Sequence, residues 1–327
     1  MFQMTSTIKV QGIKNEIKPN AIKWKRSVTD YSDTAVIKLP AIAMLKKNAD
    51  EYARVETGLK FQEGLQVEIA CGYNGTNMKR FQGFIRRISP TVPLEIECEG
   101  YSYELRKKQG FNKSYKAGTK LKTLLNDLLH GTSIKLSKSI PDITIQSPFS
   151  FSQKKGTDVL DWLKEKMLMT VYFNFDELYV GPHYTELKKT VKLQMGWNVI
   201  QDNELKFKEK KELAEVRIQV SQKQKNGKKE STEHDSKFGN TKQIKLGIRL
   251  DEATRKMIAE DQKKRLVNRG YEGAVTTFLN PYAEPAMAAQ IDDKKYPDRT
   301  GKYFIEAVEG DYSSGGGRQK IKIGANL

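Results

Sequence analysis

The stretch from Gly64 to Gly100 reads GLQVEIACGYNGTNMKRFQGFIRRISPTVPLEIECEG, in the order turn, strand, hairpin turn and strand. A second stretch near the other end of the chain, from Ala286 to Gly324, reads AMAAQIDDKKYPDRTGKYFIEAVEGDYSSGGGRQKIKIG and has the same layout. Alternating apolar residues bounded by Gly, Pro and Asn are typical of short strands joined by tight turns. The sequence therefore predicts one small β unit built twice, which points to assembly geometry rather than chemistry.

The size and composition of the chain indicate a folded protein of several domains. Its 327 residues suffice for two to four domains, each with its own core, and 38% hydrophobic residues is lean but globular. No apolar run approaches the roughly 18 residues that a membrane-spanning helix needs. The N-terminus, MFQMTSTIKVQG, lacks the apolar centre of a secretory signal, so no signal peptide is expected.

The only two cysteines, Cys71 and Cys98, are too few for a disulfide framework or a cysteine-rich metal site. Each lies in an alternating run, VEIAC or LEIEC, on the same face as the apolar residues. We therefore expect two buried free thiols in one β core.

A net charge of +17 raises the possibility of a nucleic-acid-binding protein. The lysines are dispersed, and the densest stretch, Lys206 to Lys229, also contains three glutamates and a polar loop. A solvated loop or strand edge is the favoured interpretation of that stretch. Zinc-finger spacing, the RRM aromatic box and a basic region with heptads are all missing from the sequence, but a basic nucleic-acid-binding protein remains the alternative hypothesis.

The first hundred residues have the pattern of a β domain. Short alternating runs separated by turn signals predict strands at 7–10, 35–39, 65–71, 80–88 and 94–99. Strands of this length and spacing suggest a small barrel or sandwich. Within this region, Pro40 to Glu56 is interpreted as a short helix or a lysine-tipped loop.

The next segment combines helices with a hairpin. The run LKTLLNDLLH has one leucine face, with Thr119 as its expected N-cap and Gly131 as its end. A second helix is expected to begin at Thr157 or Asp158, and a hairpin around Asp176 and Glu177 follows. These features predict a compact α/β domain.

The rest of the chain returns to strands after a polar insertion. Residues 187–220 are strand-like, and the polar tract 223–242 is expected to be a mobile loop. Asp251 is the expected N-cap of a helix that Gly270 closes, and further strands are expected at 274–278, 287–291, 303–308 and 319–323. The triple glycine at 315–317 precedes a strand rather than a helix, so a flexible hairpin tip is favoured over a phosphate-binding loop.

Catalytic motifs are missing from the sequence. It contains no HExxH, GxSxG, GxxxxGK or helix-opening GxGxxG motif. The three histidines, His130, His183 and His234, lie in different segments without ligand spacing, and the last two have no nearby partner motif. His130 is expected to complement the dipole at the end of its helix. We therefore predict a protein that is not an enzyme and holds no cofactor or metal.

Three segments carry a resemblance to a known family. They are FQGFIRRISPTVPLEIECEGYSYELRKK (81–108), KKGTDVLDWLKEKMLMTVYFNFDELYVG (154–181) and GKYFIEAVEGDYSSGGGRQKIKIG (301–324). In their order along nearly the whole chain, these segments resemble the baseplate hub proteins of contractile phage tails, the late control protein D family, and also the N-terminal hub part of type VI secretion spike proteins.

The resemblance implies an α+β, mainly β fold: two pseudo-equivalent small β-barrel domains, an intervening α/β domain and a helix-containing insertion. The expected boundaries are 1–105 for the first barrel, 106–186 for the α/β domain, 187–222 with 273–327 for the second barrel, and 223–272 for the polar loop and helical insertion. Two barrels in each of three chains would let a homotrimer present pseudo-sixfold symmetry to a hexameric tail tube and threefold symmetry to a trimeric spike.

The resemblance also implies partners and contact segments. The expected partners are two further copies of the chain, the tail tube protein, a spike or needle protein expected to be a separate polypeptide, and a tape-measure protein or DNA in the lumen. The expected location is the tail baseplate of a virion or an injection particle, assembled in the bacterial cytoplasm. The candidate ring and tube contacts lie in segments marked by Gly64, Phe81, Gly83, Tyr101, Tyr303, Gly315, Gly316 and Gly317.

Overall fold

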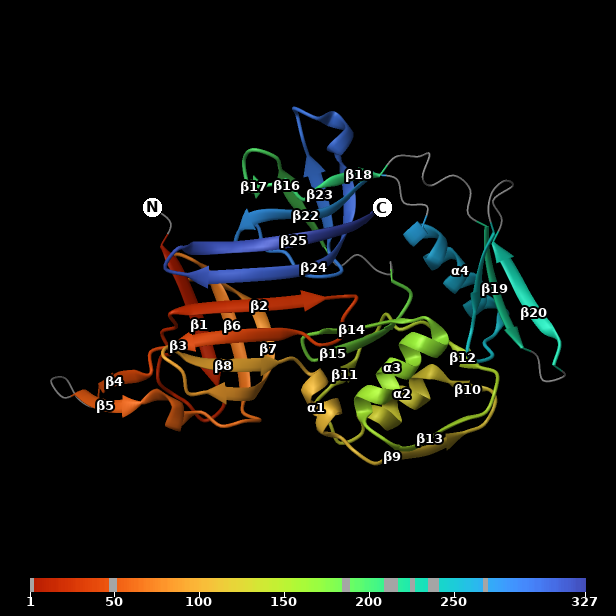
Figure 1. The fold of residues 1–327 in the computed structure, drawn as a ribbon, viewed down its shortest axis with the longest axis horizontal. Coiled ribbons are helices and arrows are strands. Elements are labelled where there is room, and N and C mark those ends of the chain that lie inside the picture. The colour runs from red at the N-terminus through yellow and green to blue at the C-terminus, as the bar shows by residue number, and fades with distance from the viewer. Residues whose placement is uncertain are drawn as a thin grey trace.

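A computed structural model describes residues 3–46, 52–183, 189–208, 217–223, 227–234, 241–266 and 270–327. The described chain is mainly β, with four α-helices. Its largest element is a sheet of 13 strands that contains both of the similar stretches (Figure 1). Two small domains of helices and short strands lie beside this sheet.

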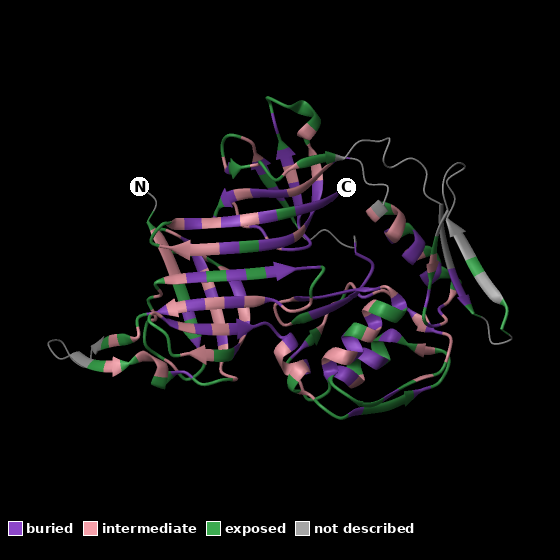
Figure 2. Ribbon diagram, viewed as in Figure 1, coloured by how far each residue is buried: buried purple, intermediate pink, exposed green. Residues whose placement is uncertain are grey.

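The N-terminal half of the sheet has the strand order β1-β6-β7-β8-β3-β2, and every neighbouring pair is antiparallel. Buried and more exposed residues alternate along these strands, as expected of a sheet with one face on a core (Figure 2). The strands are β1 (Met4–Val10), β2 (Ala21–Ser27), β3 (Thr34–Leu39), β6 (Gln66–Tyr73), β7 (Thr76–Ser89) and β8 (Leu94–Glu99).

The C-terminal half repeats this order with different strands. Its order is β16-β23-β24-β25-β22, and both β17 and β18 pair with the outer side of β22. The one difference in direction is that β16 and β23 are parallel, whereas β1 and β6 are antiparallel. The strands are β16 (Thr190–Gln194), β17 (Val199–Gln201), β18 (Lys206–Lys208), β22 (Gly270–Phe278), β23 (Ala288–Asp292), β24 (Gly301–Ser313) and β25 (Gly316–Asn326).

The two long strands, β7 and β24, share backbone detail. Ile85 exchanges hydrogen bonds with Gly64 and Leu65, at 2.8 and 2.9 Å, and Ile305 exchanges the same pair with Ala286 and Met287, both at 2.9 Å. Directly after each isoleucine, a β-bulge shifts the register toward the next strand. Gly64 and Ala286 also share a positive φ, +87° and +65°. The two similar stretches of sequence therefore form the same local hydrogen-bond pattern.

The halves join where β2 pairs antiparallel with β24, from Ala21 opposite Ser313 to Ser27 opposite Ala307. Figure 1 shows these two strands side by side in the middle of the molecule. We call this junction the seam. The mainly β, α+β class is confirmed, but two separate barrels are not: the halves form one sheet, and no pairing among the described residues closes either half.

Each half has its own core. Residues from β1, β2, β3, β6, β7 and β8 form one apolar cluster, in which both Cys71 and Cys98 are buried as free thiols, as predicted. Residues from β16, β22, β23, β24 and β25 form a second cluster. Because strands from both ends of each half share one cluster, each half of the sheet curls around its own core.

The helices and short strands beside the large sheet, called here the helical domain, are organised around a third core. It contains the leucine face of α2, the inner side of α3 and part of α4, so the insertion shares its core with the middle domain. The helices are α1 (Ser102–Lys107), α2 (Leu121–Leu129), α3 (Gly156–Met167) and α4 (Glu252–Leu266). The short strands here are β9 (Phe111–Tyr115), β10 (Thr119–Lys120), β11 (Lys135–Leu136), β12 (Thr144–Ile145), β13 (Phe149–Lys154), β14 (Thr170–Asn174) and β15 (Glu177–Gly181).

The helix starts differ from the predicted caps in two of three cases. Thr119 lies in β10 and donates to the Lys116 carbonyl at 2.7 Å, so α2 begins without it as a cap. In α3 the helix begins at Gly156, and Asp158 accepts a hydrogen bond from the Lys155 backbone at 3.0 Å. Asp251 caps α4 as predicted, accepting from the Thr254 backbone at 2.9 Å. The hairpin prediction is also confirmed, because β14 pairs with β15.

Strands occur in two segments for which none was predicted. These are 40–56, interpreted as a short helix or a lysine-tipped loop, and the polar tract 223–242, interpreted as a mobile loop, of which 224–226 and 235–240 lie outside the described residues. The segment 40–56 holds the hairpin of β4 (Ile42–Lys46) and β5 (Tyr52–Glu56), although 47–51 lies outside the described residues. The polar tract 223–242 includes β20 (Lys229–His234), which pairs with β19 (Arg217–Lys223), itself parallel to β21 (Thr241–Lys245). Strand β20, with the sequence KESTEH, is polar on both faces, and β4, with the sequence IAMLK, is a continuous apolar run that periodicity alone does not distinguish from a helix.

Two short 3₁₀ turns complete the described structure: η1 (Thr57–Lys60) and η3 (Pro297–Arg299). None of the helices in the described ranges has the length and apolar character needed to cross a membrane.

Candidate functional site

The seam contains Arg26, a buried cation on β2 that links three parts of the chain. Its guanidinium lies 3.2 Å from Asp33 and 3.5 Å from Glu284, and it donates to the Asn174 side chain at 3.2 Å. Burial alone would lower the pKa of Arg26, but the two carboxylates raise it above its ordinary value. A buried charge is tolerated only when it is paired, so this arrangement fixes how the halves and the middle domain meet.

A second buried cation, Arg80, lies on β7. It is the extra residue of a bulge, because Ile69 pairs with Phe81 and Ala70 pairs with Lys79. The bulge directs the guanidinium into the other half, where it donates to the Gln319 side chain at 3.2 Å and to the Leu279 carbonyl. Burial lowers the pKa of Arg80. Its Nε also donates to the Cys71 carbonyl of its own half at 3.4 Å. Because the other two acceptors come from the C-terminal half, Arg80 ties the two halves together.

The solvent-facing side of the seam carries paired charges. Lys23 lies 3.5 Å from Asp311 and Lys25 lies 3.3 Å from Glu309, each pair bridging β2 and β24. Further along the same sheet, Lys38 on β3 pairs with Glu95 on β8 at 2.6 Å. On this face of the described sheet, the lysines are offset by carboxylates rather than forming one positive surface.

The sequence-predicted contact residues of the first segment lie close together around the middle of β7. Gly83 is packed so tightly that an added Cβ would lie 2.1 Å from the Glu99 carbonyl oxygen. A Cβ added to Gly64 would lie 3.6 Å from the Tyr103 hydroxyl. The Tyr101 hydroxyl accepts from Gln66 at 2.8 Å and from Gln82 at 3.0 Å.

Three of the predicted contact residues are aromatic, and all three are buried. Phe81 lies in the N-terminal core, Tyr303 in the C-terminal core and Tyr101 against the helical domain. Their side chains therefore shape the segments from inside. That these segments contact other proteins stays a prediction.

The glycines at 315–317 form the tip of the β24–β25 hairpin, since Ser313 pairs with Gly316. The hairpin is therefore confirmed, with Gly315 exposed in the turn and Gly317 buried in the strand that follows. A Cβ on Gly317 would lie 2.6 Å from a Leu279 methyl group, and the Tyr73 hydroxyl donates to the Gly317 carbonyl at 3.3 Å. Tyr73 belongs to β6, so the tip of one half rests on the other.

A buried histidine that the sequence left without a partner joins three regions. The backbone amide of His183 donates to Asp261 of α4 at 2.7 Å, and its Nδ1 lies 3.1 Å from the Thr170 hydroxyl. Its Nε2 lies 3.8 Å from Glu306 of β24. His183, followed by Lys322 at 3.2 Å, holds the pKa of Glu306 below its usual range. His183, Asp261 and Glu306 are far apart in the sequence, so no local motif could predict that they meet.

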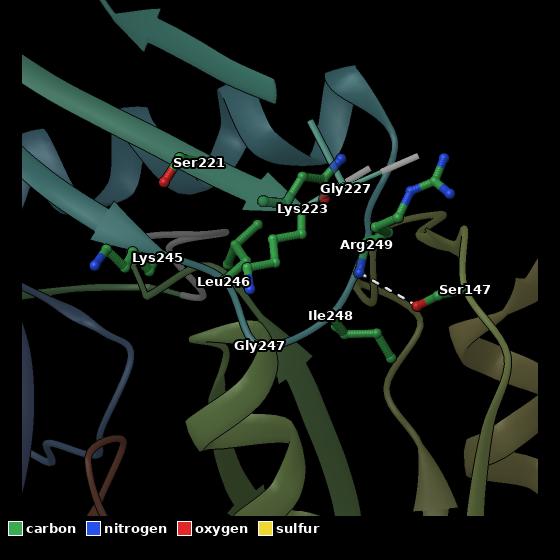
Figure 3. Close-up of a pocket in the computed structure, with 10 residues that line it drawn as sticks. Ser147, Ser221, Lys223, Gly227, Lys245, Leu246, Gly247, Ile248 and Arg249 are labelled. Carbon is green, nitrogen blue, oxygen red and sulfur yellow. Dashed lines mark hydrogen bonds between the residues drawn. The ribbon is translucent and has the colours of Figure 1, made fainter. Parts of the chain in front are cut away.

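An open pocket of about 510 Å³ lies between the β19–β21 sheet and the segment that leads into α4. Lys223, Lys245 and Arg249 line it together with Ser147 and Ser221. Figure 3 shows the charged ends of Lys245 and Arg249 pointing away from each other, and the Arg249 backbone donates to Ser147 at 3.3 Å. The cations do not converge, so the pocket lacks the geometry of an anion site. Within the described ranges, no three His, Cys, Asp or Glu side chains are grouped to hold a metal ion.

Comparisons with known proteins extend this description. No protein-family model matches the sequence, and no curated protein is similar to it at the level of sequence. Solved structures do match. The tail protein from Neisseria meningitidis MC58 aligns with a TM-score of 0.67 and 10% identity, over 98% of this chain and 96% of that one. The 43 kDa tail protein of prophage MuSo2 from Shewanella oneidensis aligns with a TM-score of 0.62 and 12% identity, over 97% of both chains.

The chain has the fold of these phage tail proteins. A third match is the E. coli c3393 protein, described as a component of the type VI secretion system with structural similarity to the T4 tail proteins gp27 and gp5. It aligns with a TM-score of 0.58 and 9% identity, over 98% of this chain and 76% of that one. The predicted resemblance to tail hubs and secretion spike proteins is thus confirmed at the level of fold.

Proposed function

We propose that this chain is the structural hub of a phage tail baseplate or a related contractile injection machine, and that it works as a homotrimer rather than as an enzyme. The observation that carries the proposal is the repeated strand order, in which β1-β6-β7-β8-β3-β2 matches β16-β23-β24-β25-β22 with β17 and β18. The full-length similarity to tail proteins supports it.

Two like units per chain suit a symmetry adaptor. Three copies would present six similar halves to a hexameric tail tube and three copies of the helical domain to a trimeric spike. The seam supports this role because its buried cations hold the two halves of each chain in one fixed relation. A rigid relation is needed if six units are to keep regular spacing.

The partners follow from the same proposal. The tube protein would contact one rim of the ring and the spike the other, while a tape-measure protein or DNA would occupy the lumen. The alternative, a basic nucleic-acid-binding protein, requires one strongly positive face. The paired charges on the outer side of the seam favour the hub, because there the lysines are already matched by carboxylates.

The mass of the particle in solution tests the proposal. Mass photometry and sedimentation at rising concentration are expected to give a species of three times the 37.3 kDa chain mass. Retention of duplex DNA that falls steeply with salt would favour the alternative. A chain that stays monomeric at all concentrations, alone and with its tube protein, would refute the hub.

A further inference from the structure

The inner edges of β7 and β24 are used differently. On β24, residues 301–304 pair with β23, and the same edge continues from Ala307 to Ser313 as the partner of β2. On β7, the ladder to β6 ends where Phe84 meets Gln66, apart from the hydrogen bonds of Ile85. Beyond that point Arg87 to Ser89 pair with β8 on the other side, and no described strand covers the edge that β2 covers on β24.

The strand that corresponds to β2 can be found by following the ladders. In the N-terminal half, Ile88 pairs with Ile96, which pairs with Ile37. In the C-terminal half, Val308 pairs with Ile321, which pairs with Val275. Ile88 thus corresponds to Val308. Each lies three residues after its matched isoleucine, Ile85 or Ile305, with the bulge in between. By the same pairing, β3 corresponds to β22.

The same correspondence carries on to the outermost strands. Thr34 lies three residues before Ile37 and pairs with Lys25 of β2. Glu272 lies three residues before Val275 and pairs with Lys206 of β18. Lys206 is therefore the counterpart of Lys25, and β18 is the counterpart of the end of β2. In the described chain β18 pairs only with β22, so its other edge is open.

Both open edges carry apolar side chains. Phe207 of β18 is 42% exposed, and nearby in the chain Trp197, just before β17, and Ile200, within β17, are 80% and 40% exposed. Ile88 on the β7 edge is half-buried, between Arg87 and Ser89. An open strand edge with exposed apolar residues is a site for pairing with another chain, and soluble proteins usually cover or charge such an edge.

We propose that β18 of one copy pairs antiparallel with the end of β7 of the next copy, with Lys206 opposite Ser89 and Phe207 opposite Ile88. This register repeats the seam, where Lys25 lies opposite Glu309 and Arg26 opposite Val308. The proposal rests on the proposed trimeric hub and names its interface. Each copy offers one β18 edge and one β7 edge, so the contact runs head to tail and closes into a ring.

The two kinds of junction differ in what stabilises them. The seam has the Lys25–Glu309 ion pair and the buried Arg26. The proposed junction has Ser89 in place of Glu309, and the apolar contact of Phe207 with Ile88 in place of the buried cation. Apolar pairs directly opposite on neighbouring strands are stabilising. The junction between copies is therefore expected to form reversibly, whereas the seam is permanent.

Disulfide trapping tests the register. In the variant S89C/K206C, the new cysteines of neighbouring copies would be directly opposite, close enough to bridge. In the matched control R87C/K206C they would be two residues out of register, too far apart. After mild oxidation at high concentration, we expect covalent dimers and trimers from S89C/K206C on a non-reducing gel, and monomers from R87C/K206C.

A second pair of variants measures the strength of the contact. Phe207→Asp is expected to raise the protein concentration needed for trimer formation at least tenfold, because a carboxylate would face Ile88. Met78→Asp, a change at an equally exposed residue (43%) at the other end of β7, is expected to leave the trimer unchanged. Circular dichroism checks that both variants fold.

The outcomes separate this inference from the hub proposal. A trimer by mass photometry in which S89C/K206C does not cross-link, or cross-links no better than R87C/K206C, would overturn the interface and leave the hub standing. A chain that neither trimerises nor cross-links would overturn both.

Discussion

The two long strands β7 and β24 have the same bulge after the same Phe-Ile pair, yet their surroundings differ completely. The extra residue of the bulge is Glu306 in β24, where it lies beside His183 and Lys322. In β7 it is Arg86, which is exposed. One copy of the unit is thus covered from both sides, and the other leaves an edge open. The comparison teaches that duplicated units in one chain can share a backbone pattern and still differ in which of their edges are covered.

The largest expected effect comes from crowding the covered edge. A Cβ on Gly310 of β24 would lie 1.9 Å from the Trp24 ring, so Gly310→Ala must push Trp24 away from the seam. We expect a loss of about 3 kcal/mol in the free energy of unfolding. Urea denaturation measures it. Gly315→Ala is the matched control, because a Cβ there meets nothing closer than 3.6 Å, and a similar loss in the control would contradict the explanation.

Removing the cation that crosses the seam is expected to have the next largest effect. Arg80→Met keeps an unbranched, apolar side chain at this position but leaves the Leu279 carbonyl and the Gln319 side chain without their donor. We expect a loss of about 2 kcal/mol, by the same urea measurement. Arg86→Met, at the exposed bulge of β7, should change stability by less than about 0.5 kcal/mol. Equal losses in both would mean that Arg80 contributes nothing specific to the seam.

The carboxylate at the bulge of β24 should give a pH-dependent effect. The pKa of Glu306 is lowered in the folded chain, so its contribution is present above the ordinary glutamate pKa of about 4.3 and is lost as pH falls through the lower folded value. Glu306→Gln is expected to cost about 1 kcal/mol at pH 7 and less at acid pH. Thermal unfolding from pH 7 to pH 3 checks this. Glu309→Gln, which removes a half-exposed ion pair with Lys25, is the matched control and should cost less than about 0.5 kcal/mol at pH 7.

The smallest expected effect concerns the two thiols in the core of the N-terminal half. Burial raises the pKa of both Cys71 and Cys98 to about 12, so almost no thiolate exists at pH 8. The folded chain should react with Ellman's reagent at neither cysteine, and the chain in guanidinium should react at both. Rapid reaction of the folded chain would show that this core opens readily, and would require Cys→Ala replacements before the cross-linking experiment.

Local patterns in the sequence predicted much of the fold. The leucine spacing of α2, the β14–β15 hairpin, the Asp251 cap and the β24–β25 tip all appear where expected, because each depends on residues close together in the chain. The hairpin of β4 and β5 and the strand β20 were missed, because the apolar run of β4 does not alternate with polar residues and β20 has no apolar face.

The contacts that define the candidate site could not be predicted in the same way. Arg80 stands beside Phe81, so simple alternation would place its side chain in solvent, and only the bulge at that position turns it into the seam. His183 meets Asp261 and Glu306 across long stretches of chain. Phe81, Tyr101 and Tyr303 were predicted to mark contact segments, and all three are buried. The sequence could not distinguish an aromatic residue of the core from one on a contact surface.

The sequence by itself determined that one strand–turn–strand unit occurs twice, because alternation and turn residues act over a few positions. The tertiary structure decided what the two copies do with their edges. Backbone hydrogen-bonding groups at a strand edge are the same whatever the sequence, so only the path of the chain determines that β2 covers β24 and that no described strand covers the free edges of β7 and β18.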